Sequence, residues 1–553
     1  MSVDGRTLPV AFPAGRPPER EPKVNFCELS LGLVTRMRPV RAARAAATLL
    51  LVAIAAMVPL ASANATTPTY TLWGHGWGHG IGMGQWGAKG LADKGWSLQK
   101  ITSLYYHGTA IGSSSLPSDV RVGLIQNQNS LSISGNGAFD LVDHTGARRA
   151  TAASGQTWTI KPITGTNQLA AYDPTGKISF TSPVPITVYY ESHSTLLKVA
   201  QTGYQYKHGR IDLDIDGTTG KERAILIVNF EQYLYGLGEM PASWPAAALQ
   251  TQAIAGRTYA AEKISRLGQN RPGCNCGMYA STLDQAYVGA AQEVTNWVNA
   301  VNSTKGQALT YGGKLIQAYY SASDGGYTEN NENVWGGSAV PYLRGVCDPG
   351  DYDNGADPHA NWTVQIDGNQ MGSDLASGGY NVGTVTHIDI LAPRGVSGRV
   401  RPVIDATHGG WKITGTTSTA RISGGTFQSL LGLQSTMAVY NITGEIRKKY
   451  DALNCTPGLP NGQAYTWKNL NGTVRGSAQD FPNGRLFLNA SNSKVFWVWG
   501  SIYTRYNSER RNGDDLGLPT GDQYAVSGGY RANFEHGYIV WTTSSNTTKL
   551  TRT

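Results

Sequence analysis

Charged residues are scarce in this chain: they make up 15% of its 553 residues, against roughly 25% in an ordinary globular domain. Intrinsically disordered chains carry much charge and few aromatic residues, and coiled coils are rich in alanine, glutamate, lysine and leucine. Neither description fits a chain with 14 Trp and 28 Tyr. The scarcity of charge excludes both classes and leaves a folded protein, long enough for about two to four domains.

Runs of like charge are absent as well, since no five consecutive residues share a sign. The net charge is +8, and residues 1–65 carry eight basic and four acidic residues, so the remainder keeps +4. Nucleic-acid binding requires a concentrated basic patch, and we therefore predict no nucleic-acid partner. A mild positive charge suits long-range attraction to an anionic cell wall.

Long apolar runs are lacking except at residues 45–61. Three arginines precede this run and Ala63-Asn64-Ala65 follows it, which is the arrangement of a Sec-type signal peptide. We predict that residues 1–65 are cleaved after Ala65, with Met37 as the candidate true start. A membrane anchor is the alternative, but only about 17 residues of the run are apolar. The mature protein is expected to be secreted to the cell wall, with no stable membrane span.

Cysteine is rare, with five in the chain and one of them in the predicted leader. Because exported proteins fold in an oxidising setting, the other four are disulfide candidates: Cys274, Cys276, Cys347 and Cys455. A bond between Cys274 and Cys276, one residue apart, is expected to be strained, so Cys347 is the favoured partner of one of them. A zinc site is the alternative, but it needs about four ligands, and no histidine stands between His208 and His359. We predict no metal and no cofactor.

Glycine is abundant, at 68 residues, without the triplet period of collagen. Short alternating apolar and polar stretches between residues 118 and 235, separated by Gly-, Asn- and Asp-rich turns, predict β-structure. A helix is predicted over Leu98–Tyr106, and a longer one over 243–267 with Ser243 as its N-cap. Residues 285–450 are expected to return to strands and loops. The predicted fold class is α+β, with a β-rich central domain.

The first candidate site stretch is the glycine-rich run at residues 74–88. Dense glycine leaves backbone NH groups open and gives little side-chain cover, as a ligand-facing loop requires. His75, His79 and Gln85 are its candidate substrate contacts. The two histidines are four residues apart, but the glycines around them argue against a helix. Since no acidic ligand lies beside them, a metal site is disfavoured. A tight structural loop is the alternative.

The second stretch places Glu239 among apolar neighbours, between Leu237 and Met240 and before Trp244. Apolar surroundings disfavour the charged form of a carboxyl group and raise its pKa. A raised pKa is what a general acid for a glycosidic oxygen needs near neutral pH. The alternative is a carboxylate that stabilises the N-terminus of the following helix.

The third stretch, residues 317–329, combines tyrosines and hydroxyl side chains around a Gly-Gly turn. Aromatic rings can stack on sugar faces while hydroxyl groups hydrogen-bond sugar OH groups. Its candidate substrate contacts are Tyr320, Ser321, Ser323, Asp324, Gly325, Gly326 and Thr328. An ordinary hairpin turn is the alternative.

Together these stretches resemble the stage II sporulation protein D family (SpoIID/LytB, the amidase enhancers). The resemblance extends over roughly residues 70–450 and is carried by 74–111, 233–261, 284–290, 304–337, 341–349, 397–400 and 420–436. It implies a lytic transglycosylase in which Glu239 is the catalytic acid and base. Gln252, Arg257 and Tyr259 match a family helix and are expected to order the site and contact substrate.

Two departures from the family pattern stand out. In many members the glycine-rich stretch closes the domain, whereas here it opens the predicted mature chain; a permuted order can rebuild one site because chain termini often lie close together. Some members carry a metal site near the Cys274 region, and the missing histidines argue against one here.

Residues 460–553 resemble LGFP repeats, which are wall-associated modules, through Leu516-Gly-Leu-Pro519 and the stretch Phe534 to Trp541. Phe481-Pro-Asn-Gly484 also recurs as Phe534-Glu-His-Gly537, which predicts a repeat. A β-domain without a ligand is the alternative, and a linker is expected near 444–462.

The leading hypothesis is a secreted lytic transglycosylase that cleaves the MurNAc–GlcNAc bond of peptidoglycan glycan strands. Its expected parts are the leader 1–65, a catalytic domain at 66–450 and a wall-associated module at 460–553. The alternative is a non-catalytic amidase enhancer, which grips glycan and stimulates a separate cell-wall amidase.

Overall fold

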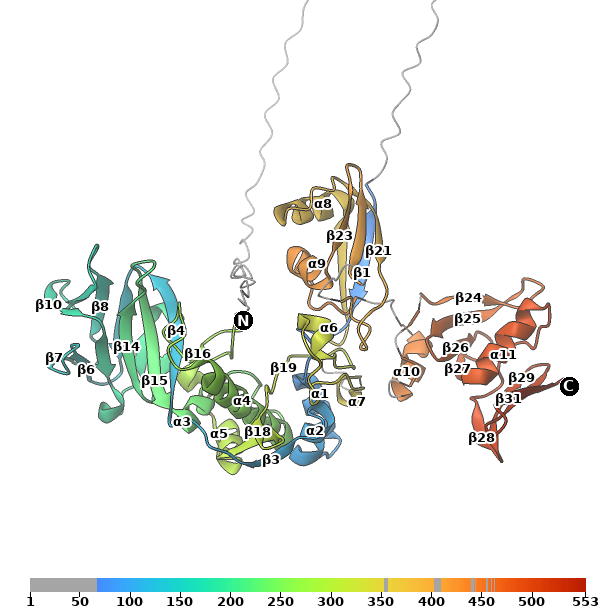
Figure 1. Cartoon of the computed structure of the whole chain (residues 1–553), viewed down its shortest axis with the longest axis horizontal. Helices are drawn as coiled ribbons and strands as arrows, with labels where there is room; N and C mark the ends of the chain where they lie inside the picture. Colours follow the sequence, from blue (N-terminus) through green and yellow to red (C-terminus); the bar gives the residue numbers. More distant parts are fainter. Residues whose placement is uncertain are drawn as a thin grey trace, which may run out of the picture. The chain divides into compact units, whose positions relative to one another are not determined.

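A computed structural model describes residues 67–352, 357–401, 409–438, 442, 444–453, 456–458, 460–461 and 463–553. These residues lie in one compact unit, Thr66–Thr553. The predicted leader and Cys455 lie outside the described residues. Within the described ranges, no helix has both the length and the apolar character needed to cross a membrane. The mixture of helices and strands confirms the predicted α+β fold class (Figure 1).

Two antiparallel-rich sheets hold most of the predicted β-structure. The larger has the order β16-β4-β15-β14-β11-β6-β7, and the other β10-β9-β8-β5-β12-β13. The bounds of the larger sheet are β4 Asp119–Gln128, β6 Phe139–Val142, β7 Arg148–Ala152, β11 Ile186–Tyr189, β14 Arg210–Ile215, β15 Glu222–Asn229 and β16 Met278–Tyr279. Those of the other are β5 Leu131–Gly135, β8 Thr157–Pro162, β9 Gln168–Tyr172, β10 Ile178–Pro183, β12 Leu197–Val199 and β13 Gln205–Tyr206.

These sheets confirm the strands that alternation predicts between residues 118 and 235. Buried side chains such as Val122, Ile211 and Leu226 form one hydrophobic core with the helices beside the sheets. Short 3-10 turns connect the strands at η1 Glu191–His193, η2 Ala200–Thr202 and η3 Gly289–Gln292.

Helix α4, Ala246–Leu267, follows this sheet region and is buried along most of its length. It begins three residues later than predicted, and Ser243 is not its cap. Trp244 N donates to the Pro241 carbonyl and closes a turn there, while the Pro245 carbonyl accepts the first helical bonds. Its buried alanines and Gly256 admit close neighbours, namely α3 Phe230–Tyr235, α5 Thr295–Ser303, α1 Gln85–Asp93 and α2 Leu98–Tyr105. The α2 helix confirms the predicted helix, with Ser97 capping it through the amide of Lys100.

Residues 285–450 contain more helix than predicted. Besides α5, the helices are α6 Asn331–Trp335, α7 Pro349–Tyr352, α8 Gly368–Ser377, α9 Gly424–Leu431 and α10 Gly444–Ala452. Most are short, so they leave little of the apolar periodicity that reveals a helix in sequence. This range also holds short strands that pair with strands from earlier in the chain: β19 Tyr320–Ser321 pairs with β2 Met83–Gly84, and β17 Gln307–Tyr311 lies between β18 Lys314–Leu315 and β3 Ala110–Ser113.

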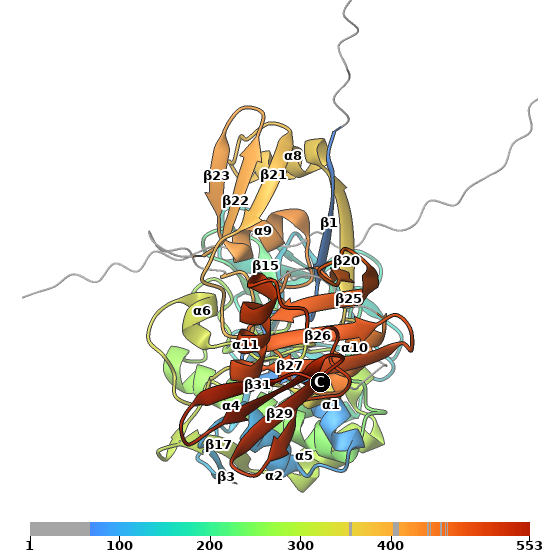
Figure 2. The same ribbon diagram turned by 90° about the vertical axis from the view of Figure 1, so that its right-hand side faces the viewer.

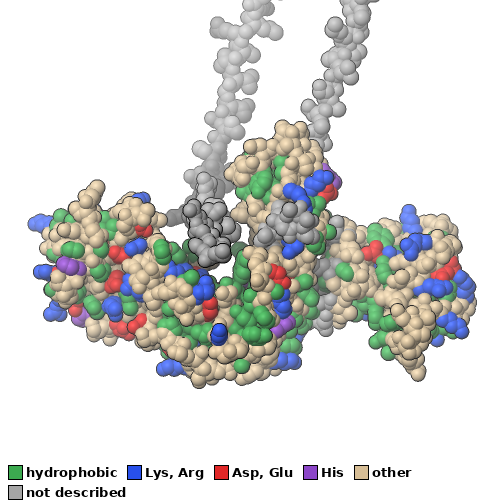
Figure 3. Space-filling model, in the orientation of Figure 1, with side chains coloured by type: hydrophobic (Ala, Val, Ile, Leu, Met, Phe, Trp, Pro, Cys, Tyr) green, Lys and Arg blue, Asp and Glu red, His purple; other side chains and the backbone are tan. Residues whose placement is uncertain are grey.

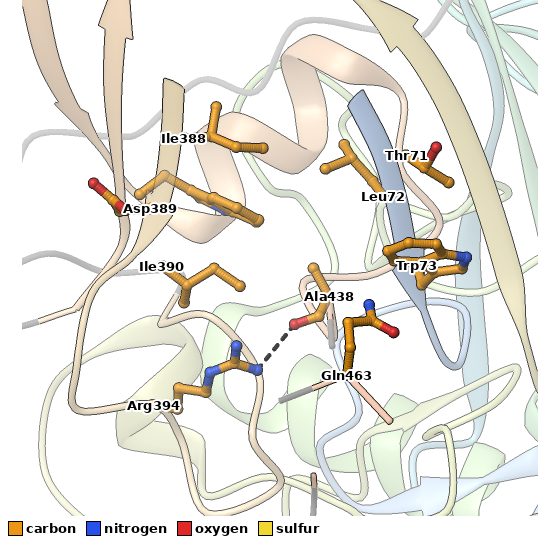
Figure 4. A pocket seen from close by; sticks show the side chains of 10 residues that line it. Thr71, Leu72, Trp73, Ile388, Asp389, Ile390, Arg394, Ala438 and Gln463 are labelled. Carbon is orange, nitrogen blue, oxygen red and sulfur yellow. Dashed lines mark hydrogen bonds between the residues drawn. The ribbon is translucent and has the colours of Figure 1, made fainter. Parts of the chain in front are cut away.

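A small lobe combines the strand just before the glycine-rich stretch with residues 362–438. Strand β1, Thr69–Gly74, pairs with β20, Trp362–Asp367, and a separate sheet holds β21 Val385–Ile390, β22 Trp411–Gly415 and β23 Thr419–Ile422. Helices α8 and α9 complete its hydrophobic core. A cavity of about 280 Å³ lies between β1 and β21, and Arg394 crosses its end to bond the Ala438 carbonyl (Figure 4).

Two four-stranded sheets form the C-terminal region. The first is β24 Tyr465–Lys468, β25 Val474–Phe481, β26 Gly484–Asn489 and β27 Lys494–Trp499, and the second is β28 Tyr524–Val526, β29 Gly529–Phe534, β30 Gly537–Thr542 and β31 Thr547–Thr551. Phe481 pairs with Gly484, and Phe534 with Gly537, at equivalent hairpin turns, which confirms the repeat. Helix α11, Gly500–Arg511, lies against both sheets (Figure 2).

The predicted linker at 444–462 contains α10. Ile446 and Tyr450 of this helix share a core with Phe481 and Trp497 of the first C-terminal sheet. The helix therefore packs with the C-terminal region and not as an extended connection, because its apolar side chains recur on one helical face.

Candidate active site around Glu239

The glycine-rich stretch forms a loop and not a helix, as the glycine density predicts. Four of its glycines have positive φ angles: Gly76, Gly78, Gly80 and Gly82. Trp77 forms a backbone bridge to Ser323, which holds the loop against the Gly-Gly turn. A Cβ at Gly80 would lie 2.3 Å from the Arg399 guanidinium, so only glycine permits this close approach.

The loop leads directly to Gln85, the first residue of α1. Strand β2 just before it pairs in parallel with β19, which carries Tyr320. The Gln85 side-chain amide donates to the backbone carbonyl of Glu239 at 3.0 Å and to Oε1 of Gln252 at 3.0 Å. Three segments far apart in sequence, the loop, α4 and β19, thus meet at Glu239.

Glu239 stands in the turn between α3 and α4, with its carboxyl group held by hydrogen bonds. The amide of Ala286 donates to Oε1 at 2.6 Å, and the side chains of Tyr320 and Gln85 also bond the carboxyl group. Burial raises the pKa of Glu239 to about 7, and the three hydrogen bonds oppose that rise. Near neutral pH such a group can donate a proton and, once ionised, take one back.

Gln285 holds the Tyr320 hydroxyl in place. Its side-chain amide donates to Tyr320 Oη at 2.8 Å and to the Gly256 carbonyl at 3.2 Å, and its Oε1 accepts from Tyr233 Oη at 2.8 Å. Gln285 was not among the predicted site residues, although it lies in the stretch 284–290 that carries part of the family resemblance.

A second carboxylate, Asp284, directly precedes Gln285 in the chain. Two neighbouring cations compensate its charge. Its side chain is 1% exposed and forms ion pairs with Lys263 and Arg271. It also accepts from the amide of Tyr279 at 2.7 Å. With its oxygens engaged by two cations and an amide, Asp284 is not available as an acid or base.

A series of aromatic rings extends from Tyr320 toward the protein surface. Tyr259 lies 6.3 Å from Tyr320 and 5.8 Å from Tyr319, between ring centroids. Trp335, which is 46% exposed, lies 4.6 Å from Tyr319 and 5.1 Å from His79. His79 and Tyr259 therefore join one aromatic surface, defined by these five rings, of the kind that stacks on sugars. Trp335 was not a predicted contact residue.

Arg257, a predicted site residue, is fully buried. It forms an ion pair with Glu231 at 2.8 Å and donates to the carbonyls of Val301 and Gln307. These bonds join α3, α4 and α5. The structure therefore places Arg257 in the framework behind Glu239. Gln252 of the same helix instead contacts Gln85, which bonds Glu239.

Most of the Gly-Gly turn is buried rather than presented to a ligand. Ser323, Asp324 and Thr328 have no exposed surface. Asp351 Oδ2 accepts from the amides of Gly325 and Gly326 at 2.7 and 3.1 Å. Ser321, on β19, accepts from the amide of Gly80 at 3.3 Å. Among the contacts predicted in this stretch, only Tyr320 bonds the Glu239 carboxyl.

Four buried aspartates gather behind this turn: Asp324, Asp348, Asp351 and Asp357. Burial, together with the neighbouring carboxyl groups, raises the pKa of Asp348 to about 6 and that of Asp357 to about 8, and raises the pKa of Asp324 strongly. Tyr105 donates to Asp348 at 2.5 Å. We call this group the carboxyl cluster; Asp324, Asp348 and Asp357 hold protons at pH values where exposed aspartates are ionised.

His75 anchors the start of the loop. Its side chain is 5% exposed, and its Nδ1 lies 2.8 Å from the Ala360 carbonyl. Burial lowers the pKa of His75, and that of His79, to about 4. Both imidazoles are therefore neutral at physiological pH. Within the described residues, no three His, Cys, Asp or Glu side chains are arranged to hold a metal ion.

The disulfide pairing differs from the expectation. Cys274 bonds to Cys276, with 5.1 Å between their Cα atoms, and Cys347 bonds to neither of them, although it too is disulfide-bonded. Asn275 between the first two has a φ of +50°, which folds the chain into a turn tight enough to bring them together. The expected pairing of Cys347 with one of these two cysteines is therefore wrong. Cys455 lies outside the described residues.

Comparison with known proteins matches two parts of the chain. Residues 218–311 match the family model described as SpoIID, Stage II sporulation protein, and residues 516–551 match the LGFP repeat. The first range holds Glu239, α4 and Gln285, while Gln85 and Tyr320 lie outside it.

Curated relatives align with part of the chain. The chain is 34% identical over 183 residues to an amidase enhancer of Bacillus subtilis (strain 168), covering 33% of this chain and 23% of that protein. It is 38% identical over 158 residues to an uncharacterized protein of Brachyspira hyodysenteriae, covering 27% and 39%. It is 33% identical over 137 residues to a stage II sporulation protein D of Bacillus amyloliquefaciens, covering 22% and 40%. The chain thus spans well under half the length of each relative.

Proposed function

We propose that this protein is a secreted lytic transglycosylase of peptidoglycan, with Glu239 as its only catalytic acid and base. The observation that carries the proposal is the Glu239 carboxyl group, whose pKa is about 7 and whose position is set by Ala286, Gln85 and Tyr320. The matches to SpoIID and to the LGFP repeat support a role at the cell wall.

The reaction requires one proton to leave Glu239 and one to return. The protonated carboxyl donates to the oxygen that joins MurNAc C1 to GlcNAc, and the C1–O bond breaks. The MurNAc 6-hydroxyl then attacks C1 while the Glu239 carboxylate takes its proton. The products are a GlcNAc end with a free hydroxyl and a 1,6-anhydro-MurNAc end, and Glu239 is protonated again.

This chemistry suits a site with a single available carboxyl group. A hydrolase of the usual kind places two carboxyl groups about 5–9.5 Å apart, on either side of the scissile bond. Here Asp284 is consumed by two ion pairs, and the nucleophile comes from the sugar itself. The exposed ring of Trp335, together with His79, Tyr319 and Tyr259, offers a surface on which adjoining sugar rings can stack.

A non-catalytic role is the second candidate, because one relative is named an amidase enhancer. In that role the same surface would grip glycan strands and present them to a cell-wall amidase, and Glu239 would bind substrate without transferring a proton. The two roles predict different products from purified glycan.

The test digests purified glycan strands with the wild-type protein and with Glu239→Gln, and counts anhydro-MurNAc ends by mass spectrometry. The amide keeps the shape of the side chain but cannot donate the proton, so anhydro ends are expected only from the wild type. Glu445→Gln, which changes an exposed glutamate paired with Lys448 on α10, is the matched control. Anhydro ends from Glu239→Gln at the wild-type rate would refute the catalytic role, and their absence from the wild type would favour the enhancer role.

A further inference from the structure

An open groove lies in the C-terminal region, between strand β24 and the end of helix α11. It has a volume of about 610 Å³. Its walls include Tyr465, Lys468, Leu470, Arg485, Arg510 and Arg511. We call it the β24–α11 groove. It lies outside the residues 516–551 that match the LGFP repeat, and within the first of the two repeated sheets.

Basic side chains line the groove and acidic ones do not. Arg485 is paired with Asp480, and Arg510 with Asp515. Lys468 and Arg511 are exposed, and neither forms an ion pair with any described residue. The groove therefore keeps an excess of positive charge, in line with the basic side chains gathered on this region in Figure 3.

Helix stabilisation accounts for only part of this charge. Basic residues in the last turn of a helix interact favourably with its C-terminal dipole, and Arg510 and Arg511 occupy that turn of α11. Lys468 belongs to β24, on the opposite wall, and gains nothing from the helix. Charge that converges from two separate elements on one open groove indicates an anionic ligand.

Apolar and aromatic groups accompany the charge. Tyr465 is 38% exposed and Leu470 is 45% exposed. Trp467, which also lines the groove, is 2% exposed, and its indole NH has no hydrogen-bond partner among the described residues. A buried donor without an acceptor is costly. The Arg510 guanidinium lies 4.6 Å from the centre of the Trp467 ring, which is a cation–π contact. The aromatic and basic groups of the groove are thus in direct contact with each other.

We propose that the β24–α11 groove binds an anionic glycan of the cell wall. Tyr465 and Leu470 would contact the sugar faces, and Lys468 and Arg511 would pair with its phosphate or carboxylate groups. This inference rests on the proposed function in one respect only, the location of the protein at the cell wall. The ligand is distinct from the peptidoglycan strand that Glu239 would cleave.

The test measures binding of the full-length Glu239→Gln protein, which cannot process a glycan, by isothermal titration calorimetry. The probes are phosphorylated dextran and polygalacturonate, with neutral dextran and poly-L-glutamate as comparisons. We expect both charged glycans to bind, more weakly as salt rises, and the tighter of the two to identify phosphate or carboxylate as the recognised group. Failure of both to bind overturns the proposal, as does equal binding of neutral dextran or poly-L-glutamate.

Variants then localise the binding. Lys468→Ala combined with Arg511→Ala should weaken binding of the charged glycans by about tenfold, since it removes two exposed charges that would pair with the ligand. Lys549→Ala, which removes an exposed lysine of β31 outside the groove, should change affinity less than about twofold. Tyr465→Ala should weaken binding of the two charged glycans, because it removes the ring that would contact their sugar faces, and should leave binding of poly-L-glutamate unchanged. Wild-type affinity in the double variant would overturn the proposal even if Glu239 proves catalytic.

Discussion

Removal of the Tyr320 hydroxyl should move the pH dependence of cleavage in a defined direction. Glu239 must be protonated to donate, so activity should fall as pH rises through its pKa of about 7. The Tyr320 hydroxyl bonds the ionised carboxyl and lowers that pKa. In Tyr320→Phe this stabilisation of the charged form is lost, and the alkaline limb of the pH profile should shift upward.

The size of the shift follows from the hydrogen bond that is lost. A hydrogen bond to a charged group contributes about 1.5–3 kcal/mol, and one pKa unit corresponds to about 1.4 kcal/mol. Because Glu239 is half-buried and keeps its bonds to Ala286 and Gln85, the low end applies, which is about one pH unit.

The assay is the pH profile of kcat/KM for release of anhydro-MurNAc ends from purified glycan strands. Tyr311→Phe, which changes a tyrosine that is 40% exposed at the end of β17, is the matched control and should leave the profile in place. An alkaline limb near the usual glutamate pKa in the wild type would show that burial does not raise the pKa of Glu239. An unshifted limb in Tyr320→Phe would refute the role of the Tyr320 hydroxyl, if thermal unfolding shows that variant to be folded.

Three further predictions concern the framework. Arg257→Met should lower the free energy of unfolding by about 3 kcal/mol, measured by urea titration, because it leaves the half-buried Glu231 carboxylate without its cation. The carboxyl cluster should make the protein less stable as pH rises. The raised folded-state pKa of Asp348 gives stability that is complete below about pH 4 and is lost as pH rises through about 6. Asp348→Asn should flatten this part of a pH series of Tm values. A non-glycine residue in the left-handed region costs about 1–3 kcal/mol. Gly80→Ala should destabilise the protein by more than this, since its Cβ also meets Arg399, whereas Gly306→Ala, with a similar φ of +71° and open space around it, should cost only the backbone strain. Equal losses of Tm in the two variants would contradict this.

The β-structure and the long helix could be predicted because their patterns are local. The strands between residues 118 and 235 alternate in sequence as they do in space, and the repeated Phe-x-x-Gly turns recur as hairpins. Ser243 and the Cys274–Cys276 bond were misjudged for a backbone reason. In each case a tight turn, closed at Pro241 or at Asn275, changes the path of the chain without a clear sequence signal.

The candidate site could be predicted in part. Glu239 stands out in the sequence because its neighbours are apolar, but its hydrogen-bond partners Ala286, Tyr320 and Gln85 lie between 47 and 154 residues away along the chain. Gln285 and Trp335 carry no distinguishing motif of their own, and only the fold reveals what they contact. Arg257 illustrates the converse, since a prominent motif residue turned out to be a buried support.

In the proposed reaction the sugar's own hydroxyl, and not water, attacks MurNAc C1. Digestion of purified glycan strands in ¹⁸O-enriched water, followed by mass spectrometry of the new ends, tests it directly. We expect anhydro-MurNAc ends without ¹⁸O, formed by the wild type and not by Glu239→Gln. Reducing MurNAc ends that carry one ¹⁸O would show hydrolysis and contradict it.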